Sequence, residues 1–300
     1  MTYPIRTAHL SKTFRRTGAL ADVTLEVPQG AIYALVGPNG AGKTTALKVL
    51  MNIHRPTAGT SEVLGVDSRR LSPAEFRQIG YVSENQEMPD WMTVDYYLHY
   101  LSNFYPAWDR RLADDLVRQL QLPCDRKLRH LSRGMKMKAA LASSLAYRPK
   151  LIVLDEPFTG LDPLVRDEFI ESLLARAEDT TILISSHDLA EIESFASHVG
   201  YLDQGRLLFS EELESLTARF REIVITFDSA PALPAPWPSG WLKPEISSAV
   251  VRFIDTAFDP DATPTRIASL FATPRDIAVN PMPLRSIFVA LAKSGRTAHA

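Results

Sequence analysis

The chain has 300 residues, of which 45% are hydrophobic and 23% are charged, values that are typical of globular proteins and exclude a fibrous or disordered chain. Its 33 Lys and Arg residues against 35 Asp and Glu residues give a formal net charge of −2, which argues against a non-specific nucleic-acid coat protein. The single cysteine, Cys124, excludes an internal disulfide and a cysteine zinc cage. Neither a signal peptide nor a run of about 18 apolar residues is found. We therefore expect a cytosolic protein of about two domains.

Residues 1–214 alternate short apolar runs with helical patterns. Residues 5–27 are typical of an antiparallel strand-and-turn layer. Apolar runs bounded by turn residues predict buried strands over residues 31–37, 151–154 and 181–185. Apolar periodicity predicts helices over residues 44–51, 94–101, 110–120, 132–147 and 164–177. Buried strands separated by helices predict an α/β domain with a mainly parallel sheet.

The last part of the chain differs in composition, because ten of the 21 prolines follow residue 215. Strands are expected over residues 223–227, 250–254 and 277–279, and helices over residues 264–271 and 284–293. This pattern predicts a small α+β accessory domain over residues 215–300. Few chemically active residues gather in it, so we expect a regulatory or dimer-supporting role without a catalytic site of its own.

A glycine-rich segment matches the pattern G-x-x-x-x-G-K-[S/T] and lies between a predicted strand and a predicted helix. It consists of Gly37, Pro38, Asn39, Gly40, Ala41, Gly42, Lys43 and Thr44, followed by Thr45. Small residues let backbone N–H groups turn toward a phosphate, and the positive end of the helix points to the same place. Lys43 can neutralise phosphate oxygens, and the Thr44 hydroxyl can ligate Mg²⁺. A tight turn with a solvated lysine is the alternative, but pattern and context together predict a nucleoside-triphosphate site.

Two carboxylates follow a buried strand at Asp155 and Glu156, on the sheet edge where ligands of open α/β sheets bind. Neighbouring strand residues point to opposite faces, so Asp155 suits Mg²⁺ and Glu156 suits the attacking water. In a sequence without a phosphate loop, two acids after a strand usually just form a solvated strand end. Downstream of a phosphate loop, the functional interpretation is favoured. His187 ends another predicted strand, where its imidazole could reach a γ-phosphate, whereas the other six histidines are interpreted as structural.

These motifs resemble, in the same order, those of the ATP-binding cassette family, the nucleotide-binding subunits of ABC transporters, over about residues 5–214. The segment Leu131-Ser132-Arg133-Gly134-Met135 resembles the LSGGQ signature, and Thr159-Gly160-Leu161-Asp162 resembles the D-loop. The resemblance also makes His187 the switch histidine and Phe14 the aromatic that stacks on adenine. It implies a P-loop NTPase cassette that hydrolyses ATP with Mg²⁺ and contains a helical subdomain at about residues 90–147.

By the same resemblance, two cassettes meet head to tail, and each ATP lies between the phosphate loop of one and the signature of the other. Ser132, Gly134 and Asp162 would then contact the partner's nucleotide. Ser132 also suits the N-cap of the helix that follows, and an ordinary capped helix explains that serine alone. Whether the two cassettes are identical stays open.

The sequence departs from the family at two places. Arg133 replaces the first glycine of the signature, where it could add positive charge near the phosphates or point into solvent, and we expect the latter. In the Q-loop, Glu84 stands at the position of the metal-binding glutamine, and Gln86 could serve if the loop shifts. A glutamate oxygen can ligate Mg²⁺ as well as an amide oxygen can, so Glu84 is the first candidate.

An aromatic cluster follows the Q-loop, where the family's membrane permease inserts its coupling helix. It consists of Trp91, Tyr96, Tyr97, Tyr100, Phe104, Tyr105 and Trp108. The spacing of Tyr97, Tyr100 and Phe104 is that of a helix core, but seven aromatics do not fit one face. We therefore expect Trp91, Tyr96 or Tyr105 to be exposed for a partner.

The resemblance implies a subunit at the cytoplasmic face of the membrane, working with a separate permease and a second cassette, with no nucleic acid expected. The single cassette with a C-terminal extension and this signature resembles bacterial exporter ATPases of the antibiotic-resistance and lantibiotic-immunity kind. The alternative is a non-transport ABC ATPase that acts on nucleic acid or ribosomes, but the distance from Lys43 to Ser132 leaves no room for a long coiled coil. A regulatory protein that binds ATP without hydrolysis is disfavoured by Glu156.

Overall fold

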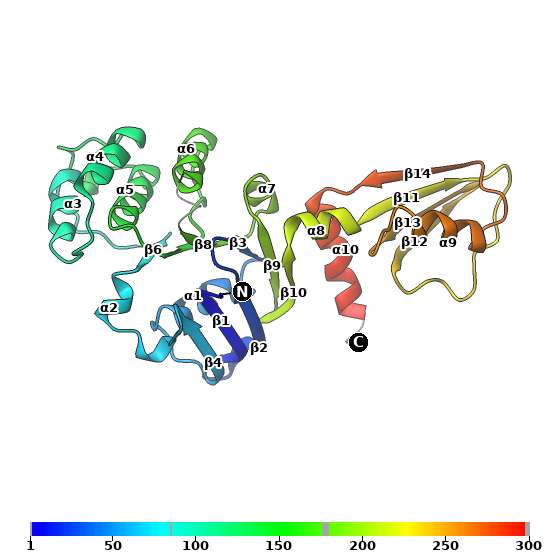
Figure 1. Cartoon of the computed structure of the whole chain (residues 1–300), viewed down its shortest axis with the longest axis horizontal. Coiled ribbons are helices and arrows are strands. Elements are labelled where there is room, and N and C mark those ends of the chain that lie inside the picture. Colours follow the sequence, from blue (N-terminus) through cyan, green and yellow to red (C-terminus); the bar gives the residue numbers. More distant parts are fainter. Residues whose placement is uncertain (1, 85, 176–179, 298–300) are drawn as a thin grey trace. The chain divides into compact units, whose positions relative to one another are not determined.

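The computed structural model describes residues 2–84, 86–175 and 180–297, with only the backbone for residues 292–297. The chain divides into two compact units, Met1–Ser210 and Glu211–Ala300 (Figure 1). The boundary expected from the sequence, after residue 214, lies a few residues further along, at the start of helix α8 (Leu213–Arg219). No helix in the described part of the chain combines the length and apolar character needed to cross a membrane.

A six-stranded sheet with the order β10-β9-β3-β8-β7-β6 forms the centre of the first unit. Its strands are β3 (Ile32–Val36), β6 (Ile79–Ser83), β7 (Leu151–Asp155), β8 (Thr181–Ser186), β9 (His198–Asp203) and β10 (Arg206–Glu212). Strands β6, β7, β8, β3 and β9 pair in parallel, and β3, β7 and β8 are buried along their whole length. This confirms the predicted parallel sheet. Register places Ser83, Asp155 and Ser185 side by side at the carboxyl edge.

A second, antiparallel sheet has the order β2-β1-β4-β5, which confirms the layer predicted over residues 5–27. Its strands are β1 (Ile5–Phe14), β2 (Thr17–Val27), β4 (Ala58–Val63) and β5 (Val66–Asp67). Helix α1 (Lys43–Leu50) contacts strands of both sheets, and its buried Leu47 and Val49 share one apolar core with Leu25 and Val153. The phosphate loop, which immediately precedes α1, is therefore held between two sheets.

The helical subdomain contains α3 (Val94–Ser102), α4 (Arg110–Gln119) and α5 (Arg133–Leu145), with α6 (Pro163–Leu174) beside them (Figure 1). Each begins at a side chain that accepts a hydrogen bond from its first turn. These caps are Thr93, Asp109, Ser132 and Asp162. The helices share a core with the central sheet that includes Leu116, Leu141 and Phe169. Short helices occur at Ser68–Arg70, α2 (Pro73–Phe76), Leu128–His130 and α7 (Leu189–Ile192). The predicted end of α6 at residues 176–177 lies outside the described residues.

The second unit has an α+β structure, as predicted, with an antiparallel sheet of order β12-β13-β11-β14. Its elements are β11 (Arg221–Thr226), β12 (Trp241–Ser247), β13 (Val250–Asp255), β14 (Asp276–Pro281), α8, α9 (Ala262–Leu270) and α10 (Leu284–Thr297). Trp241 is buried and stacks on Phe253 at 4.2 Å between ring centroids, beside Ile223, Ile267 and Phe271. Strand β12 was not predicted, because Pro244 lies within it and most of its residues are exposed.

Candidate active site

The phosphate loop approaches neighbouring backbone so closely that side chains are excluded at two of its glycines. A Cβ atom on Gly37 would lie 2.0 Å from the carbonyl oxygen of Leu202, and one on Gly42 would lie 2.5 Å from that of Ala19. Gly42 also has φ +108 and Gly40 has φ +80, values that L residues rarely adopt. These glycines allow the loop to bend into a phosphate cradle at the start of α1.

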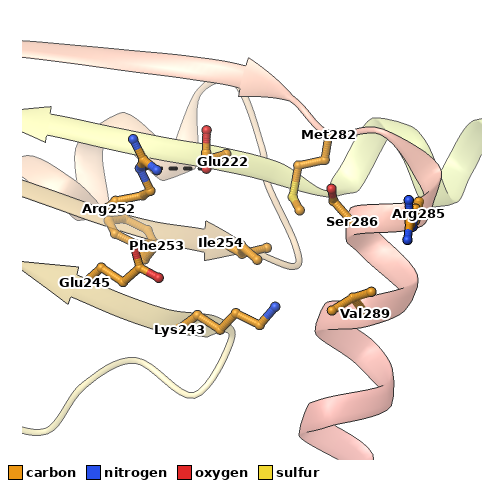
Figure 2. Close-up of a pocket in the computed structure, with 10 residues that line it drawn as sticks. All are labelled: Glu222, Lys243, Glu245, Arg252, Phe253, Ile254, Met282, Arg285, Ser286 and Val289. Atoms are coloured by element: carbon orange, nitrogen blue, oxygen red, sulfur yellow. Dashed lines mark ion pairs between the residues drawn. The ribbon is translucent and has the colours of Figure 1, made fainter.

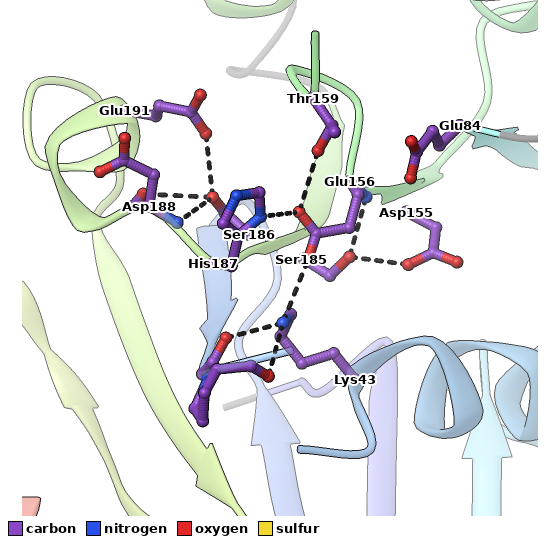
Figure 3. A network of polar contacts seen from close by, with 12 residues as sticks. Lys43, Glu84, Asp155, Glu156, Thr159, Ser185, Ser186, His187, Asp188 and Glu191 are labelled. Carbon is purple, nitrogen blue, oxygen red and sulfur yellow. Dashed lines mark hydrogen bonds and ion pairs between the residues drawn. The ribbon is translucent and has the colours of Figure 1, made fainter. Parts of the chain in front are cut away.

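Lys43 is the charged centre of this cradle. Its side chain is only 5% exposed, and its ammonium donates to the carbonyl oxygens of Gly37 at 2.7 Å and Pro38 at 3.3 Å (Figure 3). It also forms an ion pair of 3.0 Å with Glu156. A buried ammonium requires such partners, and its position lets it act on a bound phosphate at the loop.

Asp155 ends β7 and faces the first turn of α1. One of its carboxylate oxygens accepts hydrogen bonds from the hydroxyls of Thr44 at 2.9 Å and Ser185 at 2.8 Å. Burial raises the pKa of Asp155, and these two hydrogen bonds oppose that effect only in part. The Thr44 hydroxyl and the Asp155 carboxylate form an oxygen-donor pair of the kind that binds Mg²⁺. The residues present therefore fit that cation.

Glu156 has φ +51, a left-handed conformation that is strained for a glutamate. Its backbone N–H donates to the Ser185 hydroxyl at 2.9 Å. Its carboxylate contacts the Lys43 ammonium, the His187 ring at 2.7 Å and the Thr159 hydroxyl at 3.3 Å (Figure 3). Burial alone would raise the pKa of Glu156, but the hydrogen bonds from His187 and Lys43 outweigh burial and lower it. The site therefore holds an ionised carboxylate beside the phosphate loop.

His187 follows β8, which lies next to β7 in the sheet, so the predicted proximity to the carboxylates is found. Its Nδ1 atom meets Glu156, and the ring is 40% exposed. The turn behind it is fixed by the Ser186 hydroxyl, which bonds the carbonyl oxygen and the N–H of Asp188 and the carboxylate of Glu191. Glu156 and His187 thus form a positioned acid–imidazole pair.

A cavity of about 460 Å³ brings most of the predicted residues together. It is lined by Ala19, Asn39, Gly40, Ala41, Gly42, Lys43, Thr44, Thr45, Glu84, Glu156, Thr159 and His187. A neighbouring cavity of about 270 Å³ is lined by Thr44, Glu84, Gln86 and Asp155, among others. Phe14 lines neither cavity. Its ring is 40% exposed and contacts His54 at 5.1 Å and the Lys12 ammonium at 4.7 Å.

The signature residues do not join this cavity in the single chain. The Ser132 hydroxyl accepts from the Met135 N–H at 3.2 Å, which confirms the predicted N-cap of α5. Asp162 caps α6, and a Cβ on Gly134 would lie 3.2 Å from a methyl of Val165. The signature and the D-loop therefore form a group of their own where α5 packs on α6.

The Arg133 side chain is 46% exposed, so it reaches solvent as expected, but it also has a partner within the chain. Its guanidinium forms an ion pair with Glu84, and a Cβ on Gly160 would lie 3.0 Å from it. The two departures from the family pattern thus meet, and this contact joins residues that are 49 positions apart. Gln86 remains an alternative ligand, because its side-chain oxygen is buried without a hydrogen-bond partner among the described residues.

The predicted exposure in the aromatic cluster is confirmed for two of the three residues. Trp91 is 62% exposed and Tyr96 is 48% exposed, and their rings contact each other at 5.6 Å. Tyr105 is half-buried and stacks on Tyr147 at 3.9 Å. Trp91 and Tyr96 thus present one aromatic surface at the start of α3.

The core-like spacing of Tyr97, Tyr100 and Phe104 gave only a partly correct result. Tyr97 is buried, but Tyr100 and Phe104 are exposed and contact each other at 5.1 Å. Because α3 ends at Ser102, Phe104 lies beyond the helix to which the spacing rule applies.

The sequence interpretation missed Ser185, and it placed Thr159 in the D-loop without predicting its contact with Glu156. Ser185 holds the Asp155 carboxylate and the Glu156 backbone, and Thr159 bonds the Glu156 carboxylate. The signal for Ser185 was a hydroxyl residue near the carboxyl end of a buried strand, because a buried hydroxyl must find a partner.

Comparisons with known proteins identify the family of this chain. A family model for the ABC transporter matches residues 20–159. The ABC transporter ATP-binding protein YtrB of Bacillus subtilis is 33% identical over 227 residues, which cover 75% of this chain and 77% of YtrB. The bacitracin transport ATP-binding protein BcrA of Enterococcus faecalis is 31% identical, covering 74% of this chain and 73% of BcrA. A solved ATP-binding subunit of an ABC transporter is 28% identical with a TM-score of 0.67, covering 72% of this chain and 92% of that structure. The chain therefore belongs to the ATP-binding subunits of ABC transporters and carries their ATPase domain.

Proposed function

We propose that this subunit hydrolyses ATP at the cavity of the phosphate loop to drive a separate membrane permease, by ATP-dependent pairing of two cassettes. The single observation that carries the proposal is the convergence of Lys43, Glu156 and His187, from three segments of the chain, at one cavity, with Asp155 bonded to Thr44 in the neighbouring cavity. A structural salt-bridge cluster would not require the glycine cradle that surrounds it.

Each of these residues has a proposed role. The loop N–H groups and Lys43 bind the β- and γ-phosphates of ATP. Thr44 and Asp155 hold Mg²⁺, which supplies charge neutralisation at the phosphate oxygens when bound. Glu156 accepts the proton of the attacking water, and His187 holds that water and the γ-phosphate in line. Phe14, which is exposed at the end of β1 in the antiparallel sheet, stacks on the adenine base.

The third oxygen ligand of Mg²⁺ is assigned to the Q-loop. Glu84 and Gln86 both line the cavity at Thr44 and Asp155, which supports either one. Glu84→Gln and Gln86→Ala, assayed separately for the Mg²⁺ concentration that gives half-maximal hydrolysis, distinguish them. The variant of the true ligand requires more Mg²⁺, whereas unchanged requirements in both variants would remove the Q-loop from the metal site.

The experiment for hydrolysis is Glu156→Gln, which keeps the size and hydrogen bonding of the side chain but removes its basicity. Hydrolysis should fall about 10²–10⁴-fold while ATP binding persists. Glu191→Gln is the matched control, because Glu191 is a half-buried acid that bonds Ser186 rather than Lys43. Near-normal turnover in Glu156→Gln would refute the proposed site, and an equal loss in Glu191→Gln would indicate a general effect of local charge.

The separate position of Ser132, Gly134 and Asp162 supports the pairing of two cassettes. These residues lie outside the chain's own cavity, where they could contact a nucleotide held by a second cassette. The Glu156→Gln variant with ATP should therefore accumulate as a dimer in size-exclusion chromatography. A monomer at saturating ATP would contradict cassette pairing for a homodimer and leave a different cassette as the partner to be tested.

The permease contact is assigned to Trp91 and Tyr96, which are exposed aromatics of the kind that anchor protein interfaces. Such a contact would hold the subunit at the cytoplasmic face of the membrane. The resemblance of the signature to exporter ATPases, together with a relative named for bacitracin transport, supports export. We assign the part after residue 214, within the second unit, a regulatory or dimer-supporting role.

A further inference from the structure

The second unit contains an open cavity of about 460 Å³ that the nucleotide site does not use. It lies between β12 and β13 on one side and the chain from Met282 to the first turns of α10 on the other (Figure 2). All of its lining residues belong to this unit, and both charged and apolar side chains reach it. A cavity of this composition can hold a small molecule with two kinds of surface.

One face of the sheet supplies the floor. Register pairs Glu222 with Ile254 and Glu245 with Arg252, so strand alternation places these four residues on the same face. The opposite face carries Ile223 and the other residues of the apolar core with α9. The cavity is therefore on the polar face of the sheet, which faces α10 in Figure 2.

A bulge in β12 adds a lysine to this floor. Between the pairs Leu242–Ile254 and Glu245–Arg252, β12 has one more residue than β13, and the register shifts there. Lys243 takes φ +49 at this point, a left-handed conformation that L residues rarely adopt. Figure 2 shows its ammonium extending toward α10. Bulges of this kind redirect single side chains near functional sites.

The charges of the cavity are unequally satisfied. Arg252 lies 3.8 Å from the Glu222 carboxylate, whereas the side chains of Lys243 and Arg285 form no hydrogen bond or ion pair with the residues that the structure describes. Three cationic side chains face two carboxylates, Glu222 and Glu245, which leaves a net positive lining. Lys243 on the sheet and Arg285 on α10 both line the cavity, so both would attract an anionic group that is bound in it.

Apolar side chains complete the cavity beside these cations. Ile254 comes from β13, Met282 precedes α10, and Val289 is 42% exposed one turn along α10 from Arg285. A hydrated inorganic ion would leave these side chains in water, whereas a ligand with a short apolar body would cover them.

We propose that this cavity binds a small organic anion, with the anionic group between Lys243 and Arg285 and a short apolar body against Ile254, Met282 and Val289. The proposal is independent of the nucleotide site, because no residue is shared between the two cavities.

The test uses the full chain with ¹³C-methyl-labelled methionine, in which Met282 reports on the cavity and Met282→Leu assigns its signal. Hexyl phosphate is the probe, and inorganic phosphate, hexanol and hexylammonium are the comparison compounds. We expect saturable movement of the Met282 signal with hexyl phosphate alone. No movement at millimolar hexyl phosphate overturns the proposal, equal binding of hexanol or hexylammonium overturns the anion selectivity, and equal binding of inorganic phosphate overturns the apolar contact.

Variants identify the residues. Lys243→Ala and Arg285→Ala should each weaken hexyl phosphate about tenfold, because each removes one charge-assisted contact. Arg275→Ala is the matched control, since Arg275 is an exposed arginine of the same unit outside the cavity, and its affinity should be unchanged. Tryptophan fluorescence, to which the buried Trp241 contributes, verifies folding. Unchanged affinity in both cavity variants, or an equal loss in Arg275→Ala, overturns the assignment.

Discussion

Replacing Ser185 with alanine is the most informative perturbation of the nucleotide site, because one hydroxyl supports both carboxylate residues. Ser185 Oγ donates to the Asp155 carboxylate at 2.8 Å and accepts from the Glu156 N–H at 2.9 Å. The serine is fully buried, so water cannot replace either bond. A bond to a charged group contributes about 1.5–3 kcal/mol and a neutral one about 1 kcal/mol, so Ser185→Ala should lower the unfolding free energy by about 2.5–4 kcal/mol.

The cost should also depend on pH. Burial raises the pKa of Asp155. The ionisation of Asp155 therefore lowers the unfolding free energy as the pH rises from the ordinary pKa of an aspartate through the higher pKa of Asp155 in the folded protein. The Ser185 hydrogen bond opposes that rise, and its removal carries the pKa higher still. The destabilisation by Ser185→Ala should therefore be greater at about pH 8 than at about pH 5, by about 1.4 kcal/mol for each tenfold change in the acidity of Asp155.

Urea unfolding followed by circular dichroism at both pH values measures this difference. Ser61→Ala is the control, because Ser61 is also a buried serine but its hydroxyl bonds only that of Ser68, which does not titrate. Its cost should be the same at both pH values. A pH-independent cost for Ser185→Ala, or one that is greater at the lower pH, would refute the assigned role of its hydrogen bond to Asp155.

Three further outcomes are expected. His187→Ala should lower ATP turnover strongly with little change in ATP affinity, because its contact matters most in the transition state; an unchanged rate would make it structural. Trp91→Ala and Tyr96→Ala should reduce co-purification with the permease, each costing about 2 kcal/mol of binding free energy, whereas the exposed Phe104→Ala should not; equal capture by all three would relocate the interface. Gly37→Ala should abolish ATP binding, measured by a fluorescent nucleotide, because its Cβ would lie 2.0 Å from a backbone oxygen; retained affinity would contradict the rigid cradle.

The sequence predicted the parts of the fold whose residues are buried on both sides. Strands β3, β7 and β8 are mainly apolar and buried along their whole length, because both faces of the sheet are covered. Strand β10 alternates exposed and half-buried residues, and β12 contains a proline and a bulge, so neither gave a comparable signal. Local pattern thus identified the central strands but not the edges.

The sequence also determined the chemistry of the nucleotide site, because glycine, lysine and carboxylate residues at fixed spacing leave few alternatives. Contacts between distant segments were decided only by the tertiary structure. Ser185 meets Asp155 because β7 and β8 pair in register, and Arg133 meets Glu84 across 49 positions. The bulge that turns Lys243 toward α10 is likewise a property of paired strands. Sequence spacing specifies which groups are present, whereas strand register and helix packing decide which of them come within hydrogen-bonding distance.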